Sequence, residues 1–299
     1  MESAAVLSSG KGHRNENFPV ASFLIRKRHR PVILAFYRFA RAADDVADHP
    51  RAATAEKLHL LENMWRTLHG DADLSPEAAA LRTMLLERAL PAQHALQLLE
   101  AFRRDVTKLR YDNWDELMDY CRYSAMPVGR FVLDVHGESR ALWPASDALC
   151  AALQVINHLQ DCANDYRDLD RVYIPLDVLR ARGLEVSALD GARASYALRQ
   201  VIALLAERAS SLLAQSRPFA DQIADRPLAL EVSIIQRLGE DLARRLHSRD
   251  PLSQRVHHRS HEAAQVALVA AAGFLAARLR TRASRRQLSH RAGESAHGN

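Results

Sequence analysis

Apolar residues recur at three- and four-residue spacing through most of this chain, which is the period of an α-helix with one buried face. Leu81, Met84 and Leu85 show the pattern, and Ile202 and Leu205 repeat it. Runs that alternate apolar and polar residues, as half-buried strands do, are absent from the sequence. Prolines stand where such helices would begin or end. The pattern predicts an all-α protein with about nine to twelve helices.

Two of the predicted helices carry a polar stripe beside an apolar one. The first covers about residues 31–47, and its stripe, with flanking residues, reads Tyr37, Arg38, Arg41, Asp44, Asp45 and Asp48. The second covers about residues 146–167, and its stripe reads Asn157, Asp161 and Asp165. Aspartates four residues apart lie one turn apart on the same face, where their charges repel. A polar stripe is costly inside a protein unless ions or hydrogen bonds satisfy it, so we expect a cation between the two helices.

The oxygen-rich side chains of these stripes favour magnesium. Hard divalent cations take oxygen ligands, and Mg²⁺ is usually shared between a few carboxylates and the phosphates of a substrate. We predict about two or three Mg²⁺ ions with a diphosphate, held by Asp44, Asp48, Asn157, Asp161 and Asp165. His158 is expected to stand behind these ligands, because imidazole suits other metals better. The alternative is that both acidic pairs lie on solvated faces and form surface salt bridges with nearby arginines.

Composition and charge narrow the class of protein. Of the 299 residues, 48% are hydrophobic and 26% are charged, as in an ordinary globular protein, and the formal net charge is +5. A mild basic excess suits an anionic substrate or an anionic lipid surface, and we find no sequence signature of nucleic-acid binding. Three cysteines without paired spacing and a polar N-terminus indicate a reducing compartment, so we expect a cytoplasmic protein.

No Gly/Ser-rich linker divides the chain, so we expect one all-helical domain over residues 18–282 with flexible ends at 1–17 and 283–299. The apolar, alanine-rich stretch at 263–279 is shorter than the roughly 20 residues that a membrane span needs. We expect it to form a core helix. The alternative is a helix lying peripherally on the inner face of the membrane, because arginines crowd its C-terminal end: Arg278, Arg280, Arg282, Arg285 and Arg286.

Three short motifs stand in order along the chain. They are the run from Tyr37 to Asp48, the pair Tyr120-Cys121 followed by Val128-Gly129, and the Asp161 cluster followed by Arg171-Val172-Tyr173-Ile174-Pro175. In this order and at these separations they resemble the squalene/phytoene synthase family. The resemblance covers about residues 16–282. It implies an all-α, single-domain class I isoprenoid (terpenoid) synthase bundle with a central cavity.

Residues 16–22 and 157–162 resemble the hopanoid-pathway, squalene synthase-like branch of that family. The branch implies Mg²⁺-dependent conversion of presqualene diphosphate and water to hydroxysqualene and diphosphate, without NADPH. It also implies two pathway neighbours, a presqualene diphosphate synthase and a hydroxysqualene dehydroxylase. One alternative is head-to-head condensation of two farnesyl diphosphates to presqualene diphosphate or squalene, or of geranylgeranyl diphosphates to phytoene. Another is an inactive helical partner of a neighbouring isoprenoid enzyme.

The resemblance also implies roles for single residues. Asp44, Asp48, Asp161, Asp165 and Tyr120 would form the catalytic set, in which Tyr120 orients water or relays a proton. The substrate would be bound by Phe18, Tyr37, Arg38, Arg41, Asn157, Arg171 and Arg255. Gln160 stands where the wider family commonly has an arginine, and Ile235 where a tyrosine is often present. These differences remove a positive charge and a hydroxyl from the expected pocket.

Overall fold

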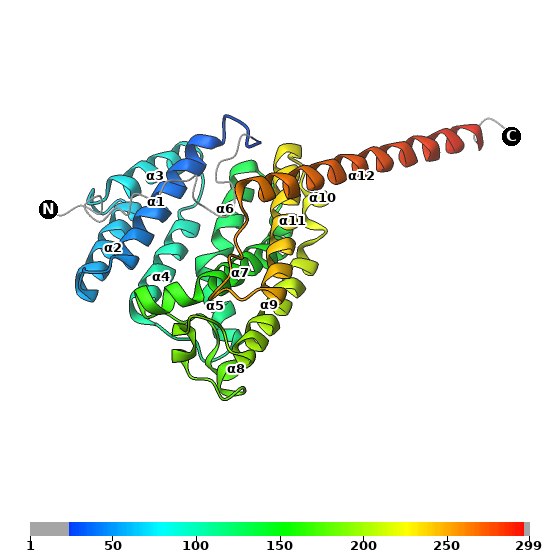
Figure 1. Ribbon diagram of the computed structural model, residues 1–299. Helices are drawn as coiled ribbons and strands as arrows, with labels where there is room; N and C mark the ends of the chain where they lie inside the picture. Colours follow the sequence, from blue (N-terminus) through cyan, green and yellow to red (C-terminus); the bar gives the residue numbers. More distant parts are fainter. Residues whose placement is uncertain (1–23, 296–299) are drawn as a thin grey trace.

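The structure is a computed structural model that describes residues 24–295, with side chains up to residue 276 and that of Arg278. Within this range the only β-type contact is an isolated bridge between Arg110 and Val172. The α-helices are α1 (Arg30–Asp48), α2 (Thr54–His69), α3 (Pro76–Glu87), α4 (Gln93–Thr107), α5 (Trp114–Ser124), α6 (Met126–His136), α7 (Trp143–Leu169), α8 (Leu176–Arg180), α9 (Tyr196–Ser216), α10 (Phe219–Gln222), α11 (Arg226–Ser248) and α12 (Ser260–Ser295). The all-α prediction is confirmed (Figure 1).

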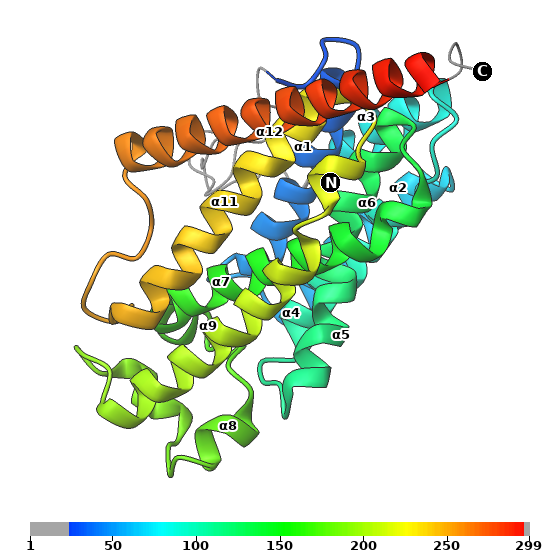
Figure 2. The same ribbon diagram turned by 90° about the vertical axis from the view of Figure 1, so that its right-hand side faces the viewer.

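The helices form two groups, each with its own hydrophobic core. In the first group α1 and α2 both pack against α3 and α4. Phe39, Leu61 and Leu99 are fully buried in this core. In the second group α7 packs against α6, α9 and α11, and its apolar face buries Leu149 and Ile156. α7 runs through the middle of the molecule (Figures 1 and 2), so it contacts helices on several of its sides.

α1 and α7 each have a proline as their second residue and carry their acidic residues toward the C-terminal end. Pro31 and Pro144 lie in the first turn, where a missing N–H costs no helical hydrogen bond. α7 ends at Leu169 because Asp170 adopts a left-handed backbone with φ 52°. The chain then turns back toward α4, and the Val172 N–H donates to the carbonyl of Leu109 at 2.9 Å.

α6 and α7 approach each other closely at Gly129. A Cβ atom at this position would lie 2.3 Å from Ser146 Oγ and 2.7 Å from Cys150 Sγ, both of which belong to α7. Real side chains do not tolerate such distances, so the approach of the two helices depends on the missing side chain.

α12 lies on the outside of the bundle, which corrects the prediction that residues 263–279 form a core helix. It packs mainly against α11 and then extends away from the other helices (Figure 1). Phe274 is buried, whereas Leu268, Val269 and Leu275 are 72%, 63% and 55% exposed. The apolar sequence therefore has one main packing partner where a core helix needs several. α12 also continues past residue 282, where we placed the end of the helical domain.

None of the helices within residues 24–295 is both long and apolar enough to span a bilayer.

Candidate active site

The two acidic stripes line one cavity of about 280 Å³ between α1, α4, α5 and α7. All four predicted aspartates line it, two from α1 and two from α7, and so does Asn157. The other lining residues are Phe102, Asp105, Tyr120, Ser124, Gln154, His158, Leu169, Arg171 and Tyr173. Folding thus brings the two distant aspartate pairs to walls of the same space, which we call the acidic cavity.

A second cavity, of about 320 Å³, lies along the same two helices, and we call it the apolar cavity. α1 lines it as far as Ala40, one turn before Asp44. α7 lines it as far as Leu153, directly before Gln154. Its walls are almost entirely hydrocarbon. Successive turns of α1 and α7 therefore face first an apolar space and then an acidic one.

Arg41 balances only part of the negative charge on the α1 wall. Its guanidinium lies 2.8 Å from Asp44 Oδ2 and 2.7 Å from Oδ1 of the buried Asp45. Burial, followed by the charge of Asp48, nevertheless raises the pKa of Asp44 to about 8. The α1 wall therefore holds more carboxylates than its own arginine can keep ionised.

Arg171 joins the end of α1 to α4. Its Nη1 lies 2.5 Å from Asp48 Oδ1, its Nη2 donates to the carbonyl of Ala47 at 3.0 Å, and its Nε donates to the carbonyl of Asp105 at 2.9 Å. Lys57 of α2 donates to the same Ala47 carbonyl at 2.9 Å. Two cations thus cap the C-terminal end of α1, where the helix dipole favours positive charge.

Asp105 of α4 is a buried carboxyl that two tyrosines contact. Tyr120 donates its hydroxyl to Oδ2 at 2.9 Å, and Tyr173 donates to Oδ1 at 2.7 Å. Burial raises the pKa of Asp105 to about 6, against the opposing effects of Arg171 and the two hydroxyls. Burial and the charge of Asp105 raise the pKa of Tyr120 well above its usual range, so its hydroxyl keeps its proton.

The α7 wall is also short of positive charge. Burial, followed by the charge of Asp161, raises the pKa of Asp165 to about 8. His158 Nδ1 lies 4.0 Å from Asp165, and the ring stacks on Tyr173 at 3.6 Å between centroids. Burial, followed by the charge of Arg171, lowers the pKa of His158 to about 3, so this imidazole is neutral. His158 therefore packs against Tyr173 but does not neutralise the negative charge of Asp161 and Asp165.

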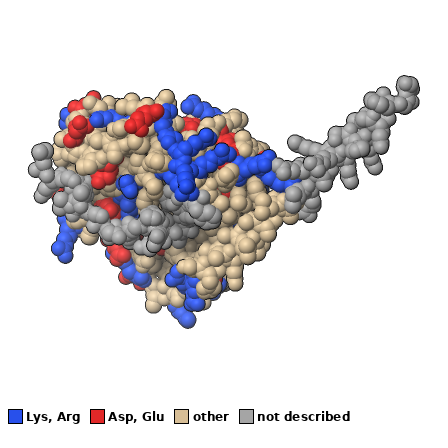
Figure 3. Space-filling view, turned by 90° about the horizontal axis from the view of Figure 1, so that it is seen from above, with Lys and Arg blue, Asp and Glu red and all other residues tan. Residues whose placement is uncertain are grey.

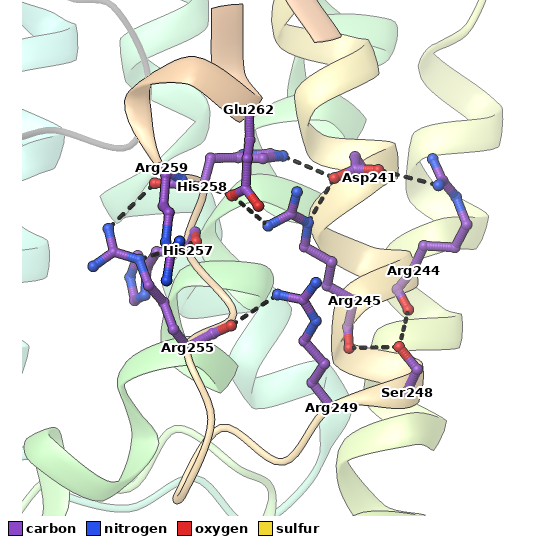
Figure 4. A network of polar contacts seen from close by, with 10 residues as sticks. All are labelled: Asp241, Arg244, Arg245, Ser248, Arg249, Arg255, His257, His258, Arg259 and Glu262. Atoms are coloured by element: carbon purple, nitrogen blue, oxygen red, sulfur yellow. Dashed lines mark hydrogen bonds and ion pairs between the residues drawn. The ribbon is translucent and has the colours of Figure 1, made fainter. Parts of the chain in front are cut away.

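The connection between α11 and α12 reaches the same wall. His257 Nε2 lies 3.4 Å from Asp161 Oδ1. An ion pair joins the two helices on either side of this connection, because Arg245 of α11 lies 3.0 Å from Glu262 of α12 and is itself held by Asp241 of α11 at 2.7 Å (Figure 4). The position of His257 thus depends on the packing of α12 against α11.

The donor set of the acidic cavity fits a hard divalent cation. Residues with carboxylate and amide oxygens line the cavity from two helices, and burial and neighbouring carboxylates raise the pKa values of Asp44 and Asp165 to about 8, an effect that a bound cation would oppose. No three of these carboxylates bring oxygens within 4.8 Å of one another in the described part of the chain. A cation here would therefore share its coordination with oxygens of a ligand, as Mg²⁺ does with phosphates.

Within the described residues a single group of three ligating side chains does lie that close together, namely His29, His136 and Asp225. Both carboxylate oxygens of Asp225 are already engaged. Oδ1 accepts the Leu228 N–H at 3.2 Å at the start of α11, and Oδ2 lies 2.9 Å from Arg26 Nε. We therefore assign no metal to this group.

Some predicted substrate-binding residues do not line the acidic cavity. Arg38 is exposed, because it stands one residue, about 100° of helix, beyond Tyr37. Arg255 is exposed, and its guanidinium donates to two backbone carbonyls of the α11–α12 connection at 3.4 and 3.3 Å (Figure 4). Tyr37 lines the apolar cavity instead. Phe18 lies outside the described residues. The roles of the residues that do line the acidic cavity stay predictions.

Several residues that line the two cavities, or that contact their walls, were not predicted from the sequence. Asp105 and His257 stand in no acidic or basic stripe, so no local signal marks them. Tyr173 belongs to the third motif but was not singled out. Glu231 lines the apolar cavity, and its signal was present: it is a charged residue in the otherwise apolar helical stripe of α11.

The family described as squalene/phytoene synthase matches residues 12–262 of the chain. A hydroxysqualene synthase of Zymomonas mobilis is 56% identical over 274 residues, which cover 91% of this chain and 92% of that protein. A hydroxysqualene synthase of Rhodopseudomonas palustris is 57% identical over 257 residues, which cover 86% and 88%. The crystal structure of squalene synthase HpnC from Alicyclobacillus acidocaldarius has a TM-score of 0.68 at 34% identity, covering 81% and 90%. The chain belongs to the squalene/phytoene synthase family, and it is an isoprenoid synthase.

Proposed function

We propose that this protein converts presqualene diphosphate and water to hydroxysqualene and diphosphate, with Mg²⁺ and without NADPH. The observation that carries the proposal is that the acidic and apolar cavities follow one another along α1 and α7. The first suits a diphosphate with its cations, and the second suits a long hydrocarbon chain. Two relatives that are hydroxysqualene synthases, at 56% and 57% identity, support this choice of reaction.

The acidic cavity would hold the diphosphate. Asp44, Asp48, Asp161 and Asp165, together with Asn157, would hold the Mg²⁺ ions, which when bound supply the positive charge that makes diphosphate a good leaving group. Arg41 and Arg171 would add fixed positive charge close to the oxygens of the diphosphate. Because Arg171 is also bonded to Asp48 and to two backbone carbonyls, its charge is held in place before the substrate arrives.

The apolar cavity would hold the hydrocarbon and exclude bulk water. Loss of diphosphate leaves a carbocation, which reacts with whatever nucleophile is nearest, so a dry wall decides its fate. Phe36 and Phe131 stack in this wall at 3.9 Å between ring centroids, and aromatic faces attract positive charge. Water must then reach the cation from one defined position.

Product analysis tests the proposed reaction. The purified protein is incubated with presqualene diphosphate and Mg²⁺ in ¹⁸O-labelled water, with no NADPH. We expect hydroxysqualene with a single labelled oxygen, one diphosphate per alcohol, and loss of turnover when EDTA removes the metal. Unchanged substrate beside an active control enzyme contradicts the proposal. Turnover of farnesyl or geranylgeranyl diphosphate would instead identify a condensing enzyme.

The proposed substrate and product place the protein between two other enzymes. One supplies presqualene diphosphate, and the other, a dehydroxylase, consumes hydroxysqualene. Both compounds are lipids, so all three reactions need access to a membrane. Complementation of a strain that contains only the two neighbouring enzymes tests this placement, with restored squalene as the expected result and accumulated presqualene diphosphate as the contrary one.

We also propose that α12 binds peripherally to the cytoplasmic face of a membrane. Leu268 and Leu275 are exposed and stand seven residues apart, which puts them on one face of the helix. Lys and Arg side chains gather on the upper face of the molecule, on the side where α12 leaves it (Figure 3). Co-sedimentation with vesicles rich in anionic lipid should be strong at low salt and weaker at high salt. Absence of binding at low salt contradicts this proposal and leaves the reaction assignment intact.

A further inference from the structure

The connection between α11 and α12, residues 249–259, is fixed to the bundle before it reaches the acidic cavity. Asp250 is 7% exposed, and its carboxylate accepts the N–H of Ala194 at 3.0 Å. Val256 is 2% exposed and belongs to the hydrophobic core of the second helix group. His257 is the next residue along the chain, so the backbone that carries it is anchored to that core.

α12 fixes the other end of this connection. Glu262, in the first turn of α12, lies 3.0 Å from Arg245 of α11 (Figure 4). His258 Nε2 lies 2.8 Å from Asp241 Oδ2, also on α11, and the His258 side chain is 7% exposed. Because His258 follows His257 directly, the packing of α12 on α11 decides where the imidazole of His257 lies.

Asp161 is the aspartate that this imidazole reaches. His257 Nε2 lies 3.4 Å from Asp161 Oδ1, where the two side chains are 29% and 41% exposed. No arginine or lysine among the described residues forms an ion pair with Asp161, whereas arginines contact both aspartates of the α1 wall. Among these residues, His257 is therefore the partner that can hold the Asp161 carboxylate.

An imidazole is well suited to hold a carboxylate that also binds a metal. It offers one N–H to one oxygen, whereas a guanidinium can occupy both oxygens at once. Contact with Oδ1 thus leaves Oδ2 of Asp161 for a cation. Hydrogen bonds to ligating carboxylates fix their orientation, and the loss of such a contact typically lowers metal affinity about 10–100-fold.

We propose that His257 is a positioning residue for the acidic cavity: it holds Asp161 in the orientation that serves a Mg²⁺ ion, and α12 holds His257 in place. This inference rests on the proposed assignment of Mg²⁺ and diphosphate to this cavity. α12 then influences ligand affinity in a cavity that none of its described residues line.

Variants at His257 test the contact itself. His257→Ala removes the imidazole, and His257→Gln keeps an N–H donor of similar reach. His247→Ala is the matched control, because His247 stands at an exposed position of α11 and lines neither cavity. Titration calorimetry measures the affinity of each protein for pyrophosphate in the presence of Mg²⁺. Thermal melts in EDTA measure the stability of each metal-free protein.

We expect His257→Ala to bind pyrophosphate at least about tenfold more weakly than the wild type. His257→Gln should recover part of the affinity, and His247→Ala should bind as the wild type does. The melting temperatures of the metal-free proteins should agree within about 3 °C, because His257 makes a partly exposed contact. A role in folding alone would lower the melting temperature and leave the affinity of the folded protein unchanged.

A second pair of variants tests the link to α12. Glu262→Gln weakens the ion pair with Arg245 but keeps an oxygen for the Arg259 N–H, which Glu262 accepts at 2.8 Å. Glu240→Gln is the control, because Glu240 of α11 pairs with other arginines and lines neither cavity. Glu262→Gln should weaken pyrophosphate binding by a smaller factor than His257→Ala does. In the His257→Ala protein it should cause no further loss, since α12 acts through His257.

The possible contrary results are distinct. Wild-type affinity in His257→Ala would refute the positioning role and leave the proposed reaction intact. No loss from Glu262→Gln, or a loss that persists undiminished in the His257→Ala protein, would refute the link to α12. If the wild type binds no pyrophosphate with Mg²⁺, the assignment of the cavity fails, and the role of His257 fails with it. If the binding results are as expected but presqualene diphosphate stays unchanged, the proposed reaction fails while the role of His257 stands.

Discussion

Arg171 and Asp48 form an ion pair with an N–O distance of 2.5 Å, although 123 residues of sequence separate them. The pair joins the segment that follows α7 to the C-terminal end of α1. The same guanidinium donates to the carbonyls of Ala47 and Asp105. Arg171 is 6% exposed, so these contacts are largely shielded from solvent. One side chain thus fixes the relative position of the two helices that carry the acidic walls.

Arg171→Gln should therefore destabilise the fold as well as the site. The substitution removes the ion pair and the guanidinium hydrogen bonds to the carbonyls of Ala47 and Asp105. Breaking a buried pair costs about 3–5 kcal/mol, and since Asp48 is partly exposed we expect the lower end, about 3 kcal/mol. Urea unfolding followed by circular dichroism measures the change.

Arg167→Gln is the matched control, because Arg167 pairs with Asp190 at 2.9 Å where both side chains are exposed. Its effect should stay within about 1 kcal/mol. Equal unfolding midpoints for the two variants would contradict the role assigned to Arg171.

The metal-free protein should lose stability as pH rises toward and through about 8. Burial and neighbouring carboxylates raise the native pKa of both Asp44 and Asp165 to about 8, above an unfolded value of about 3.9. Between these values the native state binds protons that the unfolded state has released, so stability falls with rising pH. Burial lowers the pKa of His29 to about 4, which gives the opposite slope below about pH 6.5.

Urea unfolding in EDTA between about pH 6.5 and 8.5 isolates the carboxyl contribution. Asp165→Asn removes one of the two titrating groups, so its stability should depend less on pH than that of the wild type. Asp168→Asn, at an exposed position just beyond the site, serves as the control and should keep the wild-type slope. An unchanged slope for Asp165→Asn would show that this carboxyl ionises normally in the folded protein.

Gly129→Ala should lower stability by about 1–3 kcal/mol. The added Cβ would lie 2.3 Å from Ser146 Oγ and 2.7 Å from Cys150 Sγ, so α6 and α7 must move apart. The same movement changes the shape of the apolar cavity, which both helices line.

Gly273→Ala is a useful comparison, because no described atom lies within 4 Å of a Cβ built at this helical position in α12. Alanine favours a helix over glycine by about 1 kcal/mol, so this variant should be neutral or more stable. Thermal melts should therefore shift in opposite directions. A Gly129→Ala protein as stable as the wild type would be inconsistent with the close approach of α6 and α7.

Local periodicity explains which parts of the site could be predicted. The α-helical repeat decides which side chains share a face, so the pairs Asp44 with Asp48 and Asp161 with Asp165 followed from their spacing alone. Periodicity does not say which faces meet. Asp105 belongs to the site because Arg171, 66 residues away, contacts it. No sequence pattern around Asp105 predicts this contact.

The same limit explains the wrong prediction for α12. An apolar, alanine-rich helix can have the same sequence pattern whether it is buried on all sides or packed against one other helix. The number of neighbouring helices is a property of the whole fold. Arg38 illustrates a finer limit of sequence reading. It stands beside Tyr37 in the first motif, but one residue of helix rotates it out to solvent. Glu231 could be recognised in the sequence as a charged residue within an apolar stripe, but only the structure shows that this stripe lines the apolar cavity.

The most direct test of the account asks whether Asp44 of α1 and Asp165 of α7 serve one magnesium–diphosphate site. Calorimetric titration with pyrophosphate in the presence of Mg²⁺ is carried out on the wild type, Asp44→Asn, Asp165→Asn and the double variant. Each single variant should bind at least about tenfold more weakly while remaining folded, since the substitution removes charge repulsion. Because the two residues share one bound ligand, the double variant should lose less than the sum of the single losses, by about 1 kcal/mol or more. Binding that is unchanged in all four proteins, or losses that simply add, would contradict a single shared site.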